Sequence, residues 1–511
     1  MTRAAGRVGA LTLVSRVLGF VRDAVIAAVF GASAGADAFI VAFRIPNLWR
    51  RLVFEGALTV VFIPIFLDIL LRQGREAAFG MAGAVLRRVT LILCVGTGVG
   101  LWAAPFWVTL LAPGFSGRPD DFHLAVSLTR MMLPYLPLVG AAAICMAVLQ
   151  AMGRFAAPAL GPIALNLAMI GGVLGLSGWL DGPARALSIG VLMGGALQLL
   201  LPLAEWRRTG APFRGRPPAG EGISAGRLAL HTVPATLGAS VFQINILVAT
   251  LLASFLPEGR VAALYFADRL AQFPLGVVVA ALATATLPSL SRHAAAGEWE
   301  AFQEDTRFAL RVAMYLTLPA AAGLTVLREP IVAVLFGRGA FDSAAVRWTA
   351  EALVGFAAAV PVCAGVRVAS AASFAAGNTR APLTTGGGAM VINALLGGIG
   401  VEIWGLAGIT LSLALATAFH LGMLLWVLRP AVGLLCDRVF WKSACQSAVG
   451  SLLMTVAAIF VVRLFPPTGG SLSQMTALVA VIAAGIAVYG IFSRCIRHSE
   501  FMSLLESIRK E

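Results

Sequence analysis

Long apolar segments follow one another along almost the whole chain, separated by short breaks that are charged or rich in Gly and Pro. Each segment is at least as long as the ~20 residues that an α-helix needs to cross a bilayer. The segments are 8–30, 36–68, 80–111, 123–150, 157–179, 184–205, 227–256, 261–291, 304–336, 344–374, 381–402, 405–428, 438–465 and 471–494. A strand-like period of two is missing, which argues against a transmembrane barrel. The pattern predicts an all-α polytopic membrane protein with about fourteen transmembrane helices.

Composition and charge support this class and predict an orientation. The chain is 59% hydrophobic and 12% charged, and its formal net charge is +14. Cations gather in alternate breaks, which the positive-inside rule assigns to the cytoplasm, so both termini are expected there. The cation-rich breaks contain Arg3, Arg7, Arg72, Arg75, Arg154, Arg207, Arg208, Arg214, Arg216, Arg292, Arg307, Arg380, Arg429, Arg438, Lys442, Arg494 and Arg497. No basic run is interleaved with aromatics in a soluble segment, so nucleic-acid binding is not expected.

The chain repeats itself at a constant spacing. Three pairs of prolines in similar surroundings are separated by 224 residues: Pro64 with Pro288, Pro137 with Pro361, and Pro158 with Pro382. Six helices restore the original orientation, so the repeat predicts two parallel, pseudo-symmetric six-helix lobes. The predicted domains are an N-lobe at 1–205, a cytoplasmic linker at 206–226, a C-lobe at 227–429 and two extra helices at 430–511.

The first two apolar segments carry an unusual number of charges. They are Arg16, Arg22, Asp23, Asp37, Arg44, Arg50, Arg51 and Glu55. At ~100° per residue, Asp37, Arg44, Arg51 and Glu55 fall within about 40° of one another on a helix. Charges at membrane depth usually face a bundle interior or a polar cavity and mark a functional path. Snorkelling at a helix end is the alternative for Arg50 and Arg51.

The 224-residue repeat relates one of these charged positions to a charged position in the C-lobe. Adding 224 to the position of Arg44 leads to Asp268, whose neighbour is Arg269. Most of the other charges have no counterpart, so the N-lobe is expected to build most of a cationic site. Asp268 pairing with a neighbouring arginine is the other interpretation.

Little in the chain indicates catalysis. No nucleophile–base pair, Gly-rich phosphate loop, HExxH or aspartate-rich motif is present, and the Cys and His residues lack metal-ligand spacing. The planar guanidinium of Arg binds pyrophosphate oxygens with two hydrogen bonds, so an excess of buried Arg favours an anionic ligand. A substrate that carries carboxylates instead of a pyrophosphate is the alternative. The first segment contains arginines and a second span follows at once, so it is expected to remain a helix rather than a cleaved signal.

Four motifs resemble the MurJ/MviN family of bacteria. They are SRVLGFVRD at 15–23, DAFIVAFRIPNLWRRLVFEGAL at 37–58, ADRLAQFPLG at 267–276 and FAAGNTRAP at 374–382. The resemblance covers essentially the whole chain, and the PN-x-x-RR-x-x-x-EGA pattern at 46–57 is its most specific part. It implies the multidrug/oligosaccharidyl-lipid/polysaccharide exporter fold in the bacterial inner membrane. It also implies a monomeric flippase that moves lipid II to the periplasmic face by alternating access.

The resemblance further implies site residues. The essential cavity arginines of the family match Arg16, Arg22, Arg50 and Arg269, with Asp23 beside them to orient an arginine. Asp37, Arg44, Arg51, Glu55 and Asp268 are the supporting charges. The last two helices of the family form an apolar groove thought to take the lipid tail, and the remaining surface meets membrane lipids.

Two further expectations concern coupling and alternatives. Some family members hold sodium with acids in the seventh and eleventh helices, where this chain offers Gln243, Asn245 and Asn393. A sodium site of that type is therefore not expected, and no other cofactor or metal is expected. The membrane potential and an ion gradient both remain candidate energy sources.

A related exporter of drugs or of another polyprenyl-linked glycan is the alternative function. A polyprenyl-phosphate enzyme is a further alternative, and its candidate carboxylates Asp120, Asp121 and Asp342 form no convincing site.

Overall fold

The structure is a computed structural model that describes residues 2–50, 58–210, 243–285, 287–464 and 471–510. Within these ranges every long regular element is a helix and no strand occurs, which confirms the all-α prediction. Nine of the described helices are long and apolar enough to cross a membrane. The exact helix number and the domain boundaries stay predictions, since most of the predicted linker 206–226 lies outside these residues.

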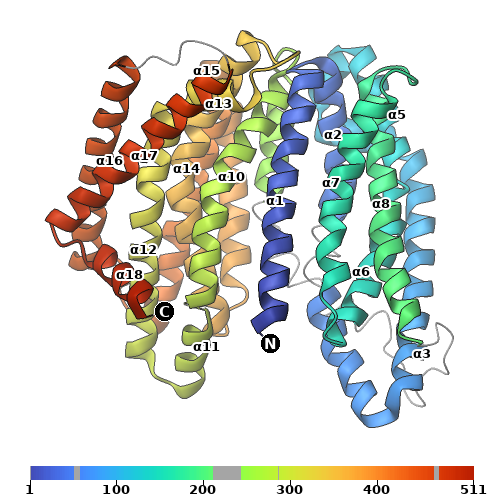
Figure 1. Ribbon diagram of the computed structural model, residues 1–511, viewed down its shortest axis with the longest axis horizontal. Helices are drawn as coiled ribbons and strands as arrows, with labels where there is room; N and C mark the ends of the chain where they lie inside the picture. Colours follow the sequence, from blue (N-terminus) through green and yellow to red (C-terminus); the bar gives the residue numbers. More distant parts are fainter. Residues whose placement is uncertain (1, 51–57, 211–242, 286, 465–470, 511) are drawn as a thin grey trace. The chain divides into compact units, whose positions relative to one another are not determined.

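The chain forms two compact units. Unit 1 contains Met1–Gln243 with two short pieces, Pro257–Ala262 and Gly339–Phe341. Its helices are α1 (Thr2–Phe30), α2 (Ala34–Trp49), α3 (Leu58–Trp102), α4 (Ala104–Leu111), the 3-10 helix η2 (Pro113–Gly117), α5 (Pro119–Met132), α6 (Tyr135–Ala151), α7 (Ala156–Leu176) and α8 (Pro183–Arg208). The main packing pairs are α7 with α8, α3 with α6, α6 with α8, α1 with α7 and α2 with α5 (Figure 1).

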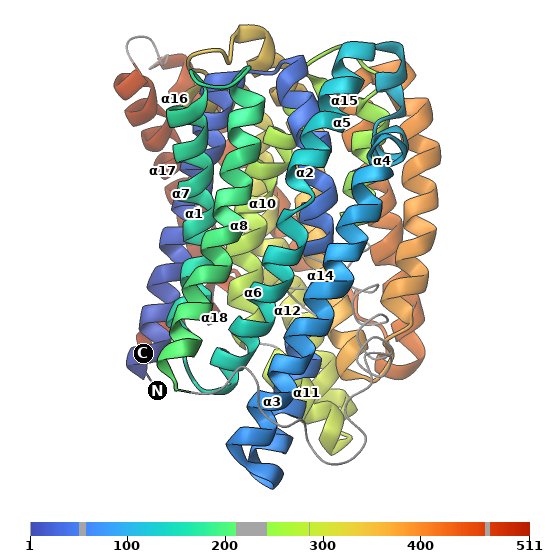
Figure 2. The same ribbon diagram turned by 90° about the vertical axis from the view of Figure 1, so that its right-hand side faces the viewer.

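Glycine allows a close contact between two helices of unit 1. A Cβ on Gly172 of α7 would lie 2.8 Å from Gly190 Cα of α8, and a Cβ on Gly190 would lie 2.8 Å from Ala168 O. Small residues bring helix backbones together in membranes, where there is no hydrophobic drive between helices. Figure 2 shows α7 and α8 running side by side along their length.

Unit 2 contains Ile244–Leu256, Ala263–Arg338 and Asp342–Glu511. Its helices are Gln243–Ala253, α10 (Arg260–Ala285, apart from its first turn), α11 (Leu287–Ala296), α12 (Trp299–Val326), α13 (Arg328–Phe336), α14 (Ser343–Ala375), α15 (Ala381–Val432), α16 (Arg438–Leu464), α17 (Ser471–Cys495) and α18 (Ser499–Lys510). Here α14 packs between α12 and α15, and α16 packs against α12 and α17.

Several predicted segments divide differently in the structure. The segment 36–68 holds α2, which ends at Trp49, and the start of α3, while 51–57 lie outside the described residues. α3 turns at Gly74 and α15 turns at Gly405, where φ is +84° and +55°. These values fall in the left-handed region that glycine enters without steric cost. Both turns lie at or beside breaks between predicted segments, since Gly74 falls between 36–68 and 80–111 and Gly405 follows the break at 403–404.

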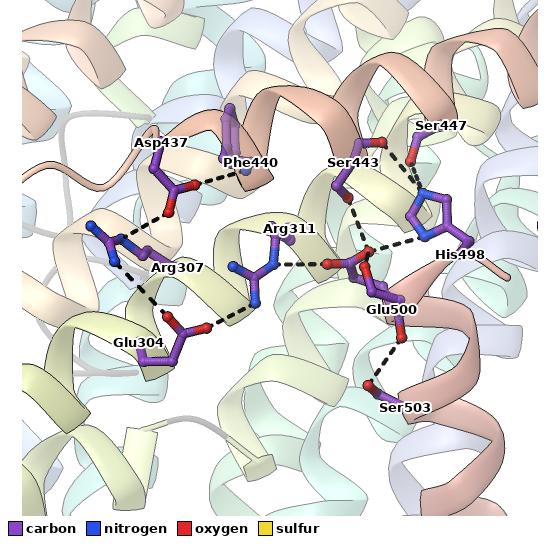
Figure 3. A network of polar contacts seen from close by, with 11 residues as sticks. Glu304, Arg307, Arg311, Asp437, Phe440, Ser443, Ser447, His498, Glu500 and Ser503 are labelled. Carbon is purple, nitrogen blue, oxygen red and sulfur yellow. Dashed lines mark hydrogen bonds and ion pairs between the residues drawn. The ribbon is translucent and has the colours of Figure 1, made fainter. Parts of the chain in front are cut away.

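A polar network fastens the last helices to α12 (Figure 3). Glu500 of α18 is 1% exposed, and its carboxylate accepts hydrogen bonds from Arg311 Nε of α12 at 2.8 Å and from Ser443 Oγ of α16 at 3.0 Å. His498 Nδ1 lies 3.0 Å from the same carboxylate. A buried charge is tolerated when it is paired and hydrogen-bonded in this way. The network therefore joins α12, α16 and α18 within unit 2.

The pKa of Glu500 makes this network testable. Burial alone would raise the pKa, but the hydrogen bonds from His498, Ser499 and Ser443 outweigh burial and lower it to about 2 from 4.5. A lowered pKa stabilises the fold above the unfolded pKa, and this stabilisation is lost as the pH falls through the folded value. We expect Glu500→Gln to lower the free energy of unfolding in detergent by about 3 kcal/mol at pH 7.

The pH dependence supplies the check. The difference between the wild type and Glu500→Gln should shrink as the pH falls from 4.5 toward 2. Glu304→Gln is the matched control, since Glu304 also binds Arg311 but is 60% exposed on its side chain. Exposed ion pairs contribute about 1 kcal/mol or less. Equal losses in both variants would contradict a special role for Glu500.

Candidate functional site

Arg22 of α1 is held by two acceptors in unit 1. Its Nε and Nη2 donate to Asp23 Oδ1 at 3.0 and 2.6 Å, and its Nη1 donates to Asn166 Oδ1 at 2.9 Å. The side chains of Arg22 and Asp23 are 13% and 5% exposed. Charge-assisted bonds of this kind are short and fix the plane of the guanidinium. Asp23 thus orients Arg22 in this structure.

Asn166 of α7 is a site residue that the sequence did not point to. Its Nδ2 donates to Ser15 O of α1 at 3.2 Å, and the side chain is buried. A Cβ on Gly19 would lie 3.5 Å from this amide nitrogen. Asn166 thereby ties the middle of α1 to α7. The available signal was one amide in an otherwise apolar segment, because a buried amide needs partners.

The other N-lobe arginines differ in their surroundings. Arg16 is exposed on α1, and Arg44 is half-buried on α2. Arg50 lies at the C-terminal end of α2, where its Nη2 and Nε donate to Asn47 Oδ1 at 2.9 and 3.3 Å. Arg51 and Glu55 lie outside the described residues.

Asp37 has a structural contact that helical phase did not indicate. Its side chain is fully buried, and its two carboxylate oxygens accept hydrogen bonds from Gly259 N at 2.8 Å and Ala262 N at 2.7 Å. These N–H groups belong to the start of α10, where an α-helix leaves its first donors unsatisfied. Asp37 therefore caps α10 within unit 1 instead of facing a polar cavity.

In unit 2, α10 presents an acid and an arginine side by side. Asp268 is 6% exposed and accepts a hydrogen bond from Gln272 Nε2. The guanidinium carbon of Arg269 lies 4.8 Å from the ring centroid of Tyr265. Stacking on an aromatic ring leaves the edge donors of a guanidinium able to bind an anion. The two residues share α10, but convergence of Arg16, Arg22, Arg50 and Arg269 on one cavity stays a prediction.

Two amides, Asn245 and Asn393, lie where some members of the family are expected to have acids that hold sodium, and they bond to each other. Asn393 Nδ2 of α15 donates to Asn245 Oδ1 at 3.1 Å and to Asn245 O at 3.3 Å, and both side chains are buried. Among the described residues, no group of three or more His, Cys, Asp or Glu could hold a metal ion. The described part of the chain thus offers amide acceptors, rather than carboxylates, at this place.

The helices with the candidate arginines differ in length or charge from the nine described candidate membrane spans. α1, α2 and α10, which carry the candidate arginines, are not among the nine described helices that are both long and apolar enough to cross a membrane; α2 has only 16 residues. These three helices hold more cations than acids, and one of the acids, Asp37, binds backbone donors. An excess of guanidinium groups in an apolar protein requires water or an anion beside it.

Comparisons with known proteins agree with one family. The family model described as "Lipid II flippase MurJ" matches residues 26–480. The chain is 31% identical to "Lipid II flippase MurJ" of Burkholderia cenocepacia, over 95% of both chains. It is 32% identical to "Probable lipid II flippase MurJ" of Vibrio cholerae, over 94% of this chain and 93% of the relative.

Solved structures show the same fold. A structure titled "Lipid II flippase MurJ, inward closed conformation" superposes with a TM-score of 0.79 at 22% identity, over 96% of this chain and 99% of that one. An inward-facing multidrug resistance transporter of the MATE family superposes with a TM-score of 0.67 at 16% identity. It covers 85% of this chain and 95% of that one.

Proposed function

This chain belongs to the MurJ family of lipid II flippases, and we propose that arginines of both lobes hold the pyrophosphate of lipid II while it crosses the membrane. The protein is a transporter and not an enzyme, and it translocates lipid II for peptidoglycan synthesis as a multi-pass protein of the bacterial inner membrane. Direction toward the periplasm, alternating access, a monomeric state and cytoplasmic termini are parts of the proposal.

One observation carries the site proposal. Asp23 and Asn166 hold the guanidinium of Arg22 at a fixed place on α1 inside an apolar unit. Preorganised donors bind a multiply charged anion without having to be ordered at that moment. Arg16, Arg50 and Arg269 would complete the site, and Asp268 would stabilise the neighbouring arginine.

The extra helices supply an apolar cavity for the lipid tail. A cavity of about 110 Å³ lies between α13, α16 and α17 in unit 2. Its lining includes Pro330, Val334, Val462, Leu478 and Val481, with Gln474 as the polar member. A cavity of this volume holds only a few carbon atoms, so its apolar walls would seat one part of an isoprenoid chain and not the whole tail. The headgroup would thus move through a polar route while the tail stays in an apolar one.

We propose that transport is not coupled to sodium bound by acidic residues. The Asn393–Asn245 amide pair occupies the expected position with neutral side chains. The membrane potential or another ion gradient would supply the energy, and each charge moved across the potential is worth ~2.3 kcal/mol per 100 mV. Flipping should therefore respond to a change of membrane potential at constant sodium.

The function is tested by genetic replacement. Cells depleted of their own lipid II flippase should grow and expose lipid II at the outer face when they express this chain. Failure of growth with a correctly inserted protein would contradict the function. A drug-export assay separates the alternative, since a drug exporter would raise resistance without rescuing growth.

Asn166 is expected to influence transport through Arg22. Asn166→Ala removes the acceptor of Arg22 Nη1 and the donor to Ser15 O, so the guanidinium loses one of its two anchors. We expect lipid II exposure to fall about tenfold, since one hydrogen bond to a charged group contributes about 1.5–3 kcal/mol. Asn166→Asp, which keeps the acceptor, should retain more activity. Equal activity of Asn166→Ala and the wild type would contradict the anchoring role.

The orientation is tested with a topology reporter. A reporter that is active only outside the cytoplasm should be silent when fused after Glu511, because the cation-rich breaks include Arg494 and Arg497 near that end. A fusion in the loop near Asp120 is the control and should be active. Activity at the C-terminus would reverse the proposed topology.

A further inference from the structure

Arg367 stands out on α14 of unit 2. α14 is the most buried of the candidate membrane spans described in this unit. In its most apolar stretch, 72% of the residues are buried. A row of less buried residues follows a spacing of four along one side: Ala358, Val362, Val366, Ser370 and Phe374. Residues four apart are neighbours on a helix surface, so these positions form one continuous ridge that is inclined to the helix axis. Arg367 lies beside this row and is exposed.

The position of Arg367 indicates a polar environment. It is the one charge in the apolar run 352–379, and the helix continues for eight residues beyond it, about 12 Å. A guanidinium facing hydrocarbon at this depth would be costly. The exposed side of α14 at Arg367 therefore borders water or headgroups instead of acyl chains.

A second observation places Arg367 near the charges of α10. Cys363, one turn before Arg367, is buried and lies close enough to interact electrostatically with both Arg367 and Asp268. Asp268 is the neighbour of Arg269, the C-lobe arginine of the proposed site. Arg367 and Asp268 are thus both close to Cys363 in unit 2, although they come from different helices. No hydrogen-bond or ion-pair acceptor for Arg367 is found in the described part of the chain.

We infer that Arg367 is a further substrate-binding arginine of the C-lobe, which contacts an anionic group of the lipid II headgroup. The inference rests on the proposed function. Its five N–H donors suit the oxygens of a pyrophosphate or of a peptide carboxylate. Lipid II carries both groups, so the shared chemistry is an oxyanion, and the experiment identifies which one binds.

The experiment measures binding by the full-length protein in nanodiscs. The two probes are lipid II and the undecaprenyl-pyrophosphate-linked disaccharide without its peptide. The variants are Arg367→Ala, Arg367→Lys and Arg347→Ala. Arg347 is the matched control because it is an exposed arginine on the same helix, near its N-terminal end. We expect about tenfold weaker binding for Arg367→Ala, a smaller loss for Arg367→Lys and none for Arg347→Ala.

Each outcome is decisive. A loss with both probes supports binding of the pyrophosphate, and a loss with lipid II alone supports binding of a peptide carboxylate. Unchanged affinity for both probes, or an equal loss in Arg347→Ala, overturns the inference and leaves Arg367 as a residue that reaches lipid headgroups.

Arg22→Ala and Arg269→Ala separate this inference from the proposed function. If they lose affinity while Arg367→Ala keeps it, only the inference about Arg367 fails. If both keep full affinity, the proposed site itself fails.

Discussion

Cells that carry only the Arg22→Ala or the Arg269→Ala protein are expected to lose lipid II at the outer face almost completely and to stop growing. Each change removes a guanidinium from the helices that hold the excess of positive charge. A pyrophosphate that loses a charge-assisted, bidentate partner in an apolar surrounding loses one compensating charge and two hydrogen bonds. The measurement is exposure of lipid II at the outer face, with the abundance of the inserted protein determined in parallel.

The controls distinguish charge from geometry and from folding. Lysine at either position keeps the charge but not the planar fork, so it should restore only part of the flipping. Arg72→Ala should leave flipping unchanged, because Arg72 is 76% exposed on its side chain and pairs with Asp68 at the surface. Normal exposure of lipid II in both Arg22→Ala and Arg269→Ala would show that these charges are structural, and the site would have to be abandoned.

The sequence predicted the helical class and the family, because both depend on features that are local in the chain. A run of apolar residues marks a membrane helix whatever it packs against. The motif at 46–57 is a short pattern, so it can be recognised without knowing the fold. Helix ends were less predictable, since the single predicted segment 304–336 is divided between α12 and α13.

The pairing of charges was less predictable than their positions. Asp23 forms an ion pair with its chain neighbour Arg22, a pairing that the seven-residue spacing of Arg16 and Asp23 did not indicate. The long side chain of arginine can reach around the helix, so Cβ direction alone does not determine its partner. The third member, Asn166, lies 144 positions away in sequence, and no periodicity within one helix can reveal it.

The contact that Asp37 makes was likewise not predictable from the sequence. Its helical phase relative to Arg44 indicates only that the two residues share a side of α2. A polar face can be directed toward a cavity or toward the unsatisfied end of another helix, and both choices satisfy a buried charge. The structure selects the second choice, through two backbone N–H donors that are 222 and 225 positions away in sequence.

Replacing Asp37 with alanine is expected to destabilise the protein more than the loss of an exposed helix cap does. The carboxylate is fully buried and binds two N–H groups at the start of α10, so its removal leaves two buried donors without an acceptor. Each unsatisfied buried group costs about 1–3 kcal/mol, whereas an exposed helix cap contributes about 1 kcal/mol. Gly259 adds to the constraint, because a Cβ there would lie 2.3 Å from Ala32 O, so the chain cannot easily move to find new partners.

The measurement is the thermal unfolding temperature of the purified protein in detergent, with Asp342→Ala as the matched control. Asp342 caps α14 through a single bond from Ala345 N at 2.8 Å and is exposed, so its loss should cost about 1 kcal/mol. Asp37→Asn should fall between the two variants, since one oxygen remains as an acceptor and the amide NH₂ opposes the second donor. Equal unfolding temperatures for Asp37→Ala and Asp342→Ala would mean that the start of α10 is not held by this carboxylate. In that case Asp37 would return to the group of charges that face a polar route.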